Sequence, residues 1–186
     1  GFDGAMDDAF VPLINHPKVL PLVVQLMSPN LSLLTTHLAY KHSDKEGTPV
    51  TRRDPGWHRD IMWTPYDLGE ANVPMLDIKA AYYLSDLSEP NSGATLFSPG
   101  SHLLKERLRI PEGKPDPANV VEPRLKPGDC VLFENRTWHA GGVNLSGRTR
   151  KAIMSGYTDQ GRRLTDYITM PDHVVNELDE IGRLLV

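Results

Sequence analysis

The stretch WHAGGVNLSGRTRKAIMSGYT, residues 138–158, decides the fold because it predicts two late strands around a tight turn. The turn falls at 144–147, where Asn, Ser and Gly are typical turn residues. Gly141 and Gly142 carry no side chain, so another backbone segment can lie close to the first of these strands. An antiparallel double sheet can therefore bring this late part of the chain beside an earlier one.

Strand and helix signals in the rest of the chain have a simple order. Strands are expected at 31–42, at 75–87, at 95–99 and on both sides of a turn at Pro127-Gly128, and helices at 16–28 and 171–186. This gives seven or eight short strands with helices only at the ends, and no alternation of strands with helices. We expect a mainly β protein, an antiparallel double sheet of jelly-roll type, with flanking N- and C-terminal helices. An immunoglobulin-like sandwich is the alternative.

Composition narrows the possible partners and compartments. The 186 residues fit a single domain, and because the chain begins at Gly1 rather than Met we expect the native N-terminus to be missing. The net charge of −4, without a basic run, argues against nucleic acid, and no apolar stretch approaches the roughly 18 residues of a membrane span. The single cysteine, Cys130, excludes an internal disulfide and fits a reducing compartment such as the cytoplasm. The oligomeric state stays open.

A His-x-Asp pair lies in GWHRDIMW, residues 56–63. In a strand, residues i and i+2 point to the same face, so His58 and Asp60 project together while Arg59 projects away. His139 follows 81 residues after His58, beside the two glycines at the start of a late strand. The three side chains can therefore meet on one inner surface.

Two imidazoles and one carboxylate are the ligand set typical of non-haem Fe(II) oxygenases. Three coordination positions then remain open, which admits a bidentate co-substrate and O2. Such a co-substrate needs its far carboxylate held, and Arg148 and Arg150 follow His139 by nine and eleven residues. A guanidinium offers the bidentate hydrogen bonding that a carboxylate favours. Both arginines are expected on one face of the final strand, and alternation does not choose between them.

Two strands offer further candidate contacts for the co-substrate or the substrate. Lys79 and Tyr83 share one face of the strand at 75–87 and Tyr82 takes the other. An inner-facing Lys79 would contact co-substrate or substrate, whereas core packing accounts for the tyrosines. Tyr40 is a further candidate on the strand at 31–42. Three tryptophans near the ligands are expected to pack or to form a substrate wall: Trp57, Trp63 and Trp138.

The order of these motifs resembles that of the phytanoyl-CoA dioxygenase family. After the His-x-Asp pair come NSGATLFSPGSHLL at 91–104, LKPGDCVLF at 125–133, and then His139 with an arginine eleven residues later. The resemblance covers roughly residues 31–158. It implies a double-stranded β-helix, cupin-like, in a single oxygenase domain over residues 1–186.

The resemblance also implies a role for each candidate. His58, Asp60 and His139 would hold Fe(II), and 2-oxoglutarate would chelate it while its C5 carboxylate pairs with an arginine. The family spacing favours Arg150 over Arg148 for that pairing. The reaction would oxidise, most simply hydroxylate, an unactivated C–H bond of a small molecule, consuming O2 and releasing succinate and CO2. Asp60 argues against halogenation, because related halogenases lack this carboxylate.

The substrate itself stays open. In the family the pocket is built from variable loops, here at 43–56, 64–74 and 105–120. No coenzyme A signature is visible, so a secondary metabolite or another small polar molecule is expected. Two other classes remain as alternatives. One is a non-catalytic jelly roll that binds a metal or a small molecule, and the other is a zinc-dependent hydrolytic cupin, which needs no carboxylate-binding arginine.

Overall fold

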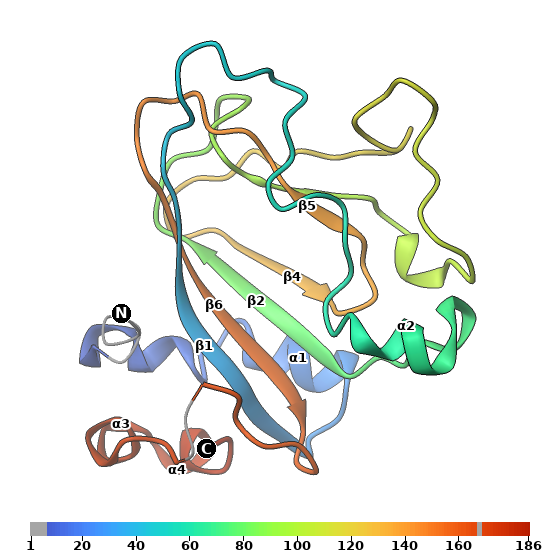
Figure 1. Ribbon diagram of the computed structural model, residues 1–186. Coiled ribbons are helices and arrows are strands. Elements are labelled where there is room, and N and C mark those ends of the chain that lie inside the picture. Colours follow the sequence, from blue (N-terminus) through green and yellow to red (C-terminus); the bar gives the residue numbers. More distant parts are fainter. Residues whose placement is uncertain (1–6, 167–168) are drawn as a thin grey trace.

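The strands form one four-stranded and one two-stranded antiparallel sheet in the computed structural model, which describes residues 7–166 and 169–186 (Figure 1). The strands are β1 (Leu31–Lys41), β2 (Asp77–Tyr83), β3 (Thr95–Phe97), β4 (Cys130–Glu134), β5 (His139–Gly141) and β6 (Arg150–Asp159). The larger sheet has the order β1-β6-β2-β4, and β3 pairs with β5 in the smaller one. All four pairings are antiparallel, so the expected mainly β, antiparallel architecture is confirmed.

Helices occupy both ends of the chain and, against expectation, its middle. The α-helices are α1 (Leu20–Leu26), α2 (Trp63–Leu68), α3 (Asp172–Glu177) and α4 (Glu180–Arg183), and the 3-10 turns are η2 (Asp8–Leu13), η3 (Glu70–Asn72) and η4 (Ser101–Leu103). The expectation that helices occur only at the ends was wrong for α2, whose segment looked like a loop. Its Pro65 lies in the first turn, where a missing N–H costs no helical hydrogen bond, and Gly69 ends it with φ 77°. Among the described residues, none of the helices has the length and apolar composition to cross a membrane.

The larger sheet carries a hydrophobic core on its outer face, against the terminal helices. Ile78 and Tyr82 of β2 and Tyr157 of β6 pack there with Val23 of α1 and Val174 of α3. Both tyrosine hydroxyls reach the N-terminal segment, where Tyr157 Oη donates to the Ile14 carbonyl at 2.8 Å and Tyr82 Oη to that of Leu13 at 3.1 Å. Figure 1 shows these helices gathered on one side of the sheet. The flanking helices thus complete the core rather than the inner surface.

The inner face of the larger sheet packs on the smaller one through a second core. Ala81 and Tyr83 of β2, Phe133 of β4 and Phe97 of β3 belong to this core, and the ring centroids of Phe97 and Phe133 lie 5.1 Å apart. Lys79 has the same parity as Ala81 and Tyr83, whereas Ile78 and Tyr82 belong to the outer core. The expected division of this strand, with Lys79 and Tyr83 on one face and Tyr82 on the other, therefore holds.

The described residues contain six strands rather than seven or eight. The segment before the Pro127-Gly128 turn makes only isolated bridges, from Val121 to Phe97 and from Leu125 to Leu87. Pro123 lies between the two bridging residues and Pro127 follows them, and because neither supplies a ladder donor no continuous strand forms. The turn itself is present, since Asp129 N donates to the Lys126 carbonyl at 3.0 Å and Gly128 has φ 95°.

A short antiparallel pairing brings residues 54–60 beside β5 and the residues that precede it. His58 and His139 exchange two backbone hydrogen bonds of 3.0 Å each. At one end Gly141 N donates to the Pro55 carbonyl at 2.9 Å, and at the other Asp60 N donates to the Asn135 carbonyl at 3.0 Å. The early and late segments singled out in the sequence therefore do lie side by side.

Gly141 is needed for this approach. A Cβ at position 141 would lie 2.1 Å from the Asp54 carbonyl oxygen. We expect Gly141→Ala to lower the free energy of unfolding by about 1–3 kcal/mol, the usual cost of overpacking, because the backbone of the paired segment must move away. Urea unfolding followed by circular dichroism measures the change.

Gly56→Ala is the matched control. It lies in the same segment, and a Cβ there would meet nothing within 4 Å. Equal unfolding midpoints for the two variants would contradict the role assigned to the close approach at Gly141.

Asp77 opens β2 as a buried carboxyl group. It is only 1% exposed, and its Oδ1 has no hydrogen-bond partner. Burial raises the pKa of Asp77 to about 6; Lys79 and Arg162 oppose the shift, and Asp60 and Glu134 add to it. The folded chain therefore holds a proton on this carboxyl group more tightly than the unfolded chain does.

Asp77→Asn should stabilise the protein at neutral pH. The wild type loses stability as the pH rises from about 4 to about 6, because the folded state must give up a proton that the unfolded state has already lost. The variant lacks this loss. The difference in the free energy of unfolding between Asp77→Asn and the wild type should therefore grow from about pH 4 to about pH 6 and then level off at up to about 3 kcal/mol. Urea unfolding at several pH values measures the free energy of unfolding of both proteins. A difference that does not change with pH would contradict the assignment to this carboxyl group.

Candidate metal centre

Three side chains from the paired segments converge between the two sheets. One potential ligand atom from each of His58, Asp60 and His139 lies within 4.8 Å of the other two. The imidazole centroids are 4.2 Å apart, and His139 Nε2 lies 3.8 Å from Asp60 Oδ1. The convergence expected from the His-x-Asp pair and the late histidine is thus present in the structure.

Backbone carbonyl groups orient both imidazoles. His58 Nδ1 lies 2.7 Å from the Gly56 carbonyl oxygen, and His139 Nδ1 lies 2.9 Å from that of Thr137. A carbonyl oxygen only accepts, so each Nδ1 carries the proton and donates it. This leaves each Nε2 lone pair available to a metal, in the arrangement usual for histidine ligands.

The protonation of His139 also suits metal binding. Burial lowers its pKa to about 4, and the nearby His58 acts in the same direction, while Asp60 opposes the shift. At neutral pH the ring is therefore neutral, and a neutral imidazole is the form that binds metals.

Asp60 supplies the negative charge of the cluster. Its Oδ1 is the oxygen close to His139, and its Oδ2 is buried without a hydrogen bond of acceptable geometry. Lys79 Nζ lies 2.9 Å from that Oδ2, so the contact is a charge pairing rather than a directional hydrogen bond. Two neutral imidazoles and a partly satisfied carboxylate around one point are a donor set that fits a divalent cation such as Fe(II).

Arg150 lies at the start of β6 and is buried without a carboxylate partner among the described residues. It is 8% exposed, and it donates from Nε to the Gly93 carbonyl and from Nη1 to that of Ala39, both at 3.1 Å. Its guanidinium also lies 6.0 Å from the ring centroid of Tyr83, and burial lowers its pKa. A buried cation held only by neutral groups is a place where an anion would be favourable.

The other sequence candidates lie in different surroundings. Arg148 is exposed and precedes β6, so the expectation that it shares a strand face with Arg150 was wrong. The strand begins later than alternation suggested, because residues 144–148 form a turn closed by Asn144, whose side chain donates to the Arg148 carbonyl. Tyr40 is 55% exposed on β1. A co-substrate role for either residue stays a prediction without structural support.

A cavity of about 230 Å³ borders the metal cluster at His58. Its lining is Trp57, His58, Arg59, Met62, Pro65, Tyr66, Glu70, Arg107 and Trp138. Two of the three tryptophans named from the sequence therefore line it, whereas Trp63 is 58% exposed and does not. Helix α2 supplies part of the wall, which the sequence did not reveal because that segment was expected to be a loop.

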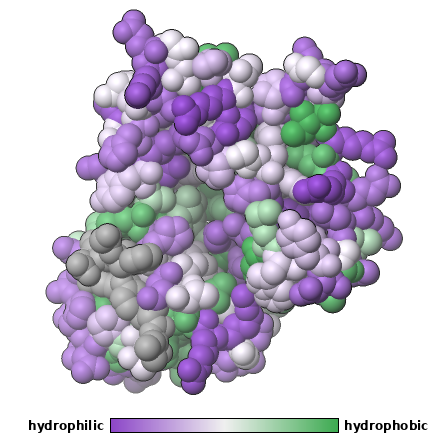
Figure 2. Space-filling view, in the orientation of Figure 1, coloured by the Kyte–Doolittle hydropathy of each residue, from purple (hydrophilic) through white to green (hydrophobic). Residues whose placement is uncertain are grey.

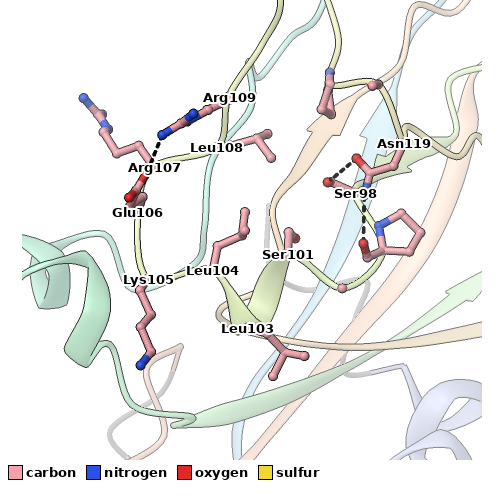
Figure 3. Close-up of a pocket in the computed structure, with 14 residues that line it drawn as sticks. Ser98, Ser101, Leu103, Leu104, Lys105, Glu106, Arg107, Leu108, Arg109 and Asn119 are labelled. Carbon is pink, nitrogen blue, oxygen red and sulfur yellow. Dashed lines mark hydrogen bonds and ion pairs between the residues drawn. The ribbon is translucent and has the colours of Figure 1, made fainter.

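A larger hollow of about 570 Å³ lies under the loop at 98–119 and contains none of the three ligand candidates. Figure 3 shows its wall, in which Ser98 donates to Asn119 at 2.9 Å and Arg109 pairs with Glu106 at 2.8 Å.

The face seen in Figure 2 is mostly hydrophilic, with hydrophobic residues in a recess near its middle.

The ion pair between Lys79 and Asp60 was not foreseen. Lys79 was a candidate for contact with co-substrate or substrate, and the structure places it against a metal-ligand candidate instead. The strand parity of Lys79 was readable from the sequence. Its contact with Asp60 was not, because β2 pairs with β4 and β6 and not with the His-x-Asp segment.

Comparison with known proteins places this site in a family. The family model of phytanoyl-CoA dioxygenase (PhyH) matches residues 4–152. Dioxygenase cdmA of Talaromyces verruculosus is 33% identical over 98 residues, which are 52% of this chain and 32% of that protein. Dioxygenase trt7 of Aspergillus terreus is 27% identical over 114 residues, 61% of this chain and 38% of that protein. The chain thus spans about a third of the length of these curated relatives.

Solved structures share the fold. The non-heme monooxygenase ThoJ, in its nickel complex, gives a TM-score of 0.60 at 20% identity and covers 90% of this chain and 69% of its own. The epimerase SnoN in complex with Fe3+, alpha-ketoglutarate and nogalamycin RO gives a TM-score of 0.58 at 23% identity. The match covers 85% of this chain and 61% of SnoN. The family match extends over most of the chain and contains both halves of the metal cluster. The chain therefore belongs to the phytanoyl-CoA dioxygenase family.

Proposed function

We propose that the chain is the catalytic part of an Fe(II)- and 2-oxoglutarate-dependent dioxygenase that hydroxylates an unactivated C–H bond of a small molecule. The observation that carries the proposal is the pairing of two features. Two histidines and an aspartate lie together between the sheets, and a buried arginine without a carboxylate partner among the described residues lies against Tyr83 of the inner core. A zinc hydrolase would have no use for that arginine.

Each residue has a defined task in this proposal. His58 and His139 present their Nε2 lone pairs, and Asp60 presents Oδ1 and the negative charge. Arg150 would pair with the C5 carboxylate of 2-oxoglutarate, while Phe133 and Phe97, whose rings lie beside that of His139, would exclude water from the metal side. When bound, the iron with 2-oxoglutarate and O2 supplies the oxidising chemistry, and the co-substrate leaves as succinate and CO2.

The substrate is proposed to be a secondary metabolite with an apolar or aromatic body. The cavity beside His58 is walled by Trp57, Trp138 and Tyr66, which suit flat or bulky rings, and the ion pair of Arg59 with Glu70 adds polar groups. The structurally similar SnoN is described as an epimerase from nogalamycin biosynthesis, which supports this class of substrate.

Anaerobic titration tests the centre directly. Addition of Fe(II) and then 2-oxoglutarate should produce a weak visible charge-transfer band, and admission of O2 should release succinate. His58→Ala should abolish both, because it removes one of three ligands. His102→Ala is the control: this half-buried histidine lies outside the cluster and should keep both signals. Unchanged succinate release by His58→Ala would reject the assignment, and metal binding without any 2-oxoglutarate turnover would favour a non-catalytic binding protein.

Arg150→Leu should raise the KM for 2-oxoglutarate by about ten- to a hundredfold. The loss of hydrogen bonds to a charged group costs about 1.5–3 kcal/mol, and 1.4 kcal/mol is a factor of ten. Succinate formation at varied 2-oxoglutarate measures the change, and Arg148→Leu is the matched control on the exposed turn. Because Arg150 also bonds two backbone carbonyls, Mn(II) binding by the variant checks that the site still folds. Equal KM values for the two variants would contradict the role of Arg150.

A further inference from the structure

Lys79 lies at an unusual place for a lysine. It sits in the middle of β2, paired with Phe133 of β4 on one side and Gly156 of β6 on the other. Its side chain is only 20% exposed and lies on the inner face, where its neighbours of equal parity, Ala81 and Tyr83, are fully buried. Lysine is seldom buried without a partner, and the partner here is Asp60.

The two oxygens of Asp60 have different neighbours. Oδ1 lies 3.8 Å from His139 Nε2, and Oδ2 lies 2.9 Å from Lys79 Nζ. A metal bound by both imidazoles would therefore be reached by Oδ1, while Oδ2 stays with the ammonium group. The lysine and the metal act on different oxygens and do not compete for the same one.

We propose that Lys79 is a positioning residue that fixes the rotation of the Asp60 carboxylate, so that this ligand binds the metal through one oxygen. The inference rests on the proposed function, since it concerns the same metal centre. Without Lys79 the carboxylate would be free to rotate, and Oδ1 would no longer be held toward the two imidazoles. Partners of metal ligands that act in this way contribute strongly to metal affinity.

The neighbour of Lys79 on β6 is a glycine. Gly156 lies directly across from Lys79, and a Cβ there would come within 2.7 Å of Thr35 Cγ2 and 3.9 Å of Lys79 Cγ. The tight contact is with Thr35, whereas the distance to Lys79 is an ordinary van der Waals contact, so the lysine stem packs against Gly156 without crowding. Other charged groups stand near the ammonium. Burial raises the pKa of Asp77 and the positive charge of Lys79 opposes that shift, whereas burial and then Lys79 both lower the pKa of His37.

A purely electrostatic effect of Lys79 would have the opposite sign. An ammonium group near a divalent cation repels it, so if repulsion dominated, removal of the charge would tighten metal binding. If positioning dominates, removal weakens binding. The sign of the change therefore decides between the two effects.

The test compares Lys79→Met, Lys79→Arg and the wild type in anaerobic calorimetric titrations with Mn(II) or Co(II) alone. We expect Lys79→Met to weaken binding by about 10- to 100-fold, and Lys79→Arg to restore most of the affinity. Lys151→Met is the matched control, since Lys151 is exposed on β6. The ligand-field absorption of the Co(II) form should change in Lys79→Met and not in Lys151→Met, because an Asp60 carboxylate that is no longer held in one orientation would alter the ligand field.

Two outcomes would overturn the inference: unchanged or tighter metal binding by Lys79→Met, or a Co(II) spectrum identical to that of the wild type. Thermal unfolding of the apo variants checks that each one folds. The proposed function is tested separately by the wild type, which must bind the metal. If the wild type binds and Lys79→Met binds equally well, only the role of Lys79 fails. If the wild type does not bind, both proposals fail.

Discussion

The antiparallel pairing of residues 54–60 with β5 is the constraint on which the metal cluster depends. The paired segment has no long strand of its own, and a few backbone hydrogen bonds hold it, two of them between His58 and His139 themselves. Residues that are 81 positions apart in the chain thereby become direct neighbours. The absence of a side chain at Gly141 permits the contact, since the Asp54 carbonyl occupies the space that a Cβ would need.

The two faces of the larger sheet differ in composition: one forms the main hydrophobic core and the other carries the charged side chains near the metal cluster. Its outer face is apolar and packs on the terminal helices, whereas the inner face places charged groups among apolar ones. Lys79, Asp77 and Arg150 all lie there, partly or wholly buried. Burying charge is costly, and an unpaired buried group such as Asp77 Oδ1 costs most. A chain selected for stability alone would have apolar residues at these positions.

Local rules in the sequence predicted the mainly β, antiparallel fold class and the His-x-Asp half of the cluster. His139 lies 81 residues from His58 and was assigned to the cluster from the two glycines beside it and from the family resemblance. Alternation places His58 and Asp60 on one face, and two glycines mark where another backbone can approach. The sequence was insufficient wherever the answer depended on register or on where an element begins. Because β6 begins only at Arg150, Arg148 lies outside the strand. A segment expected to be a loop forms α2, and Lys79 of β2 contacts Asp60 of a different segment. Those outcomes depend on contacts between segments that no local pattern encodes.

The way in which the imidazoles are braced has a consequence for how such a site can diversify. Each histidine donates its Nδ1 proton to the carbonyl group two positions earlier in its own segment, at Gly56 and at Thr137. A main-chain acceptor is present whatever side chain occupies those positions. Substitutions at Gly56 or Thr137 therefore leave the acceptor of each Nδ1 proton in place. Residues of the surrounding loops can change without altering the tautomer in which the two histidines present their Nε2 atoms.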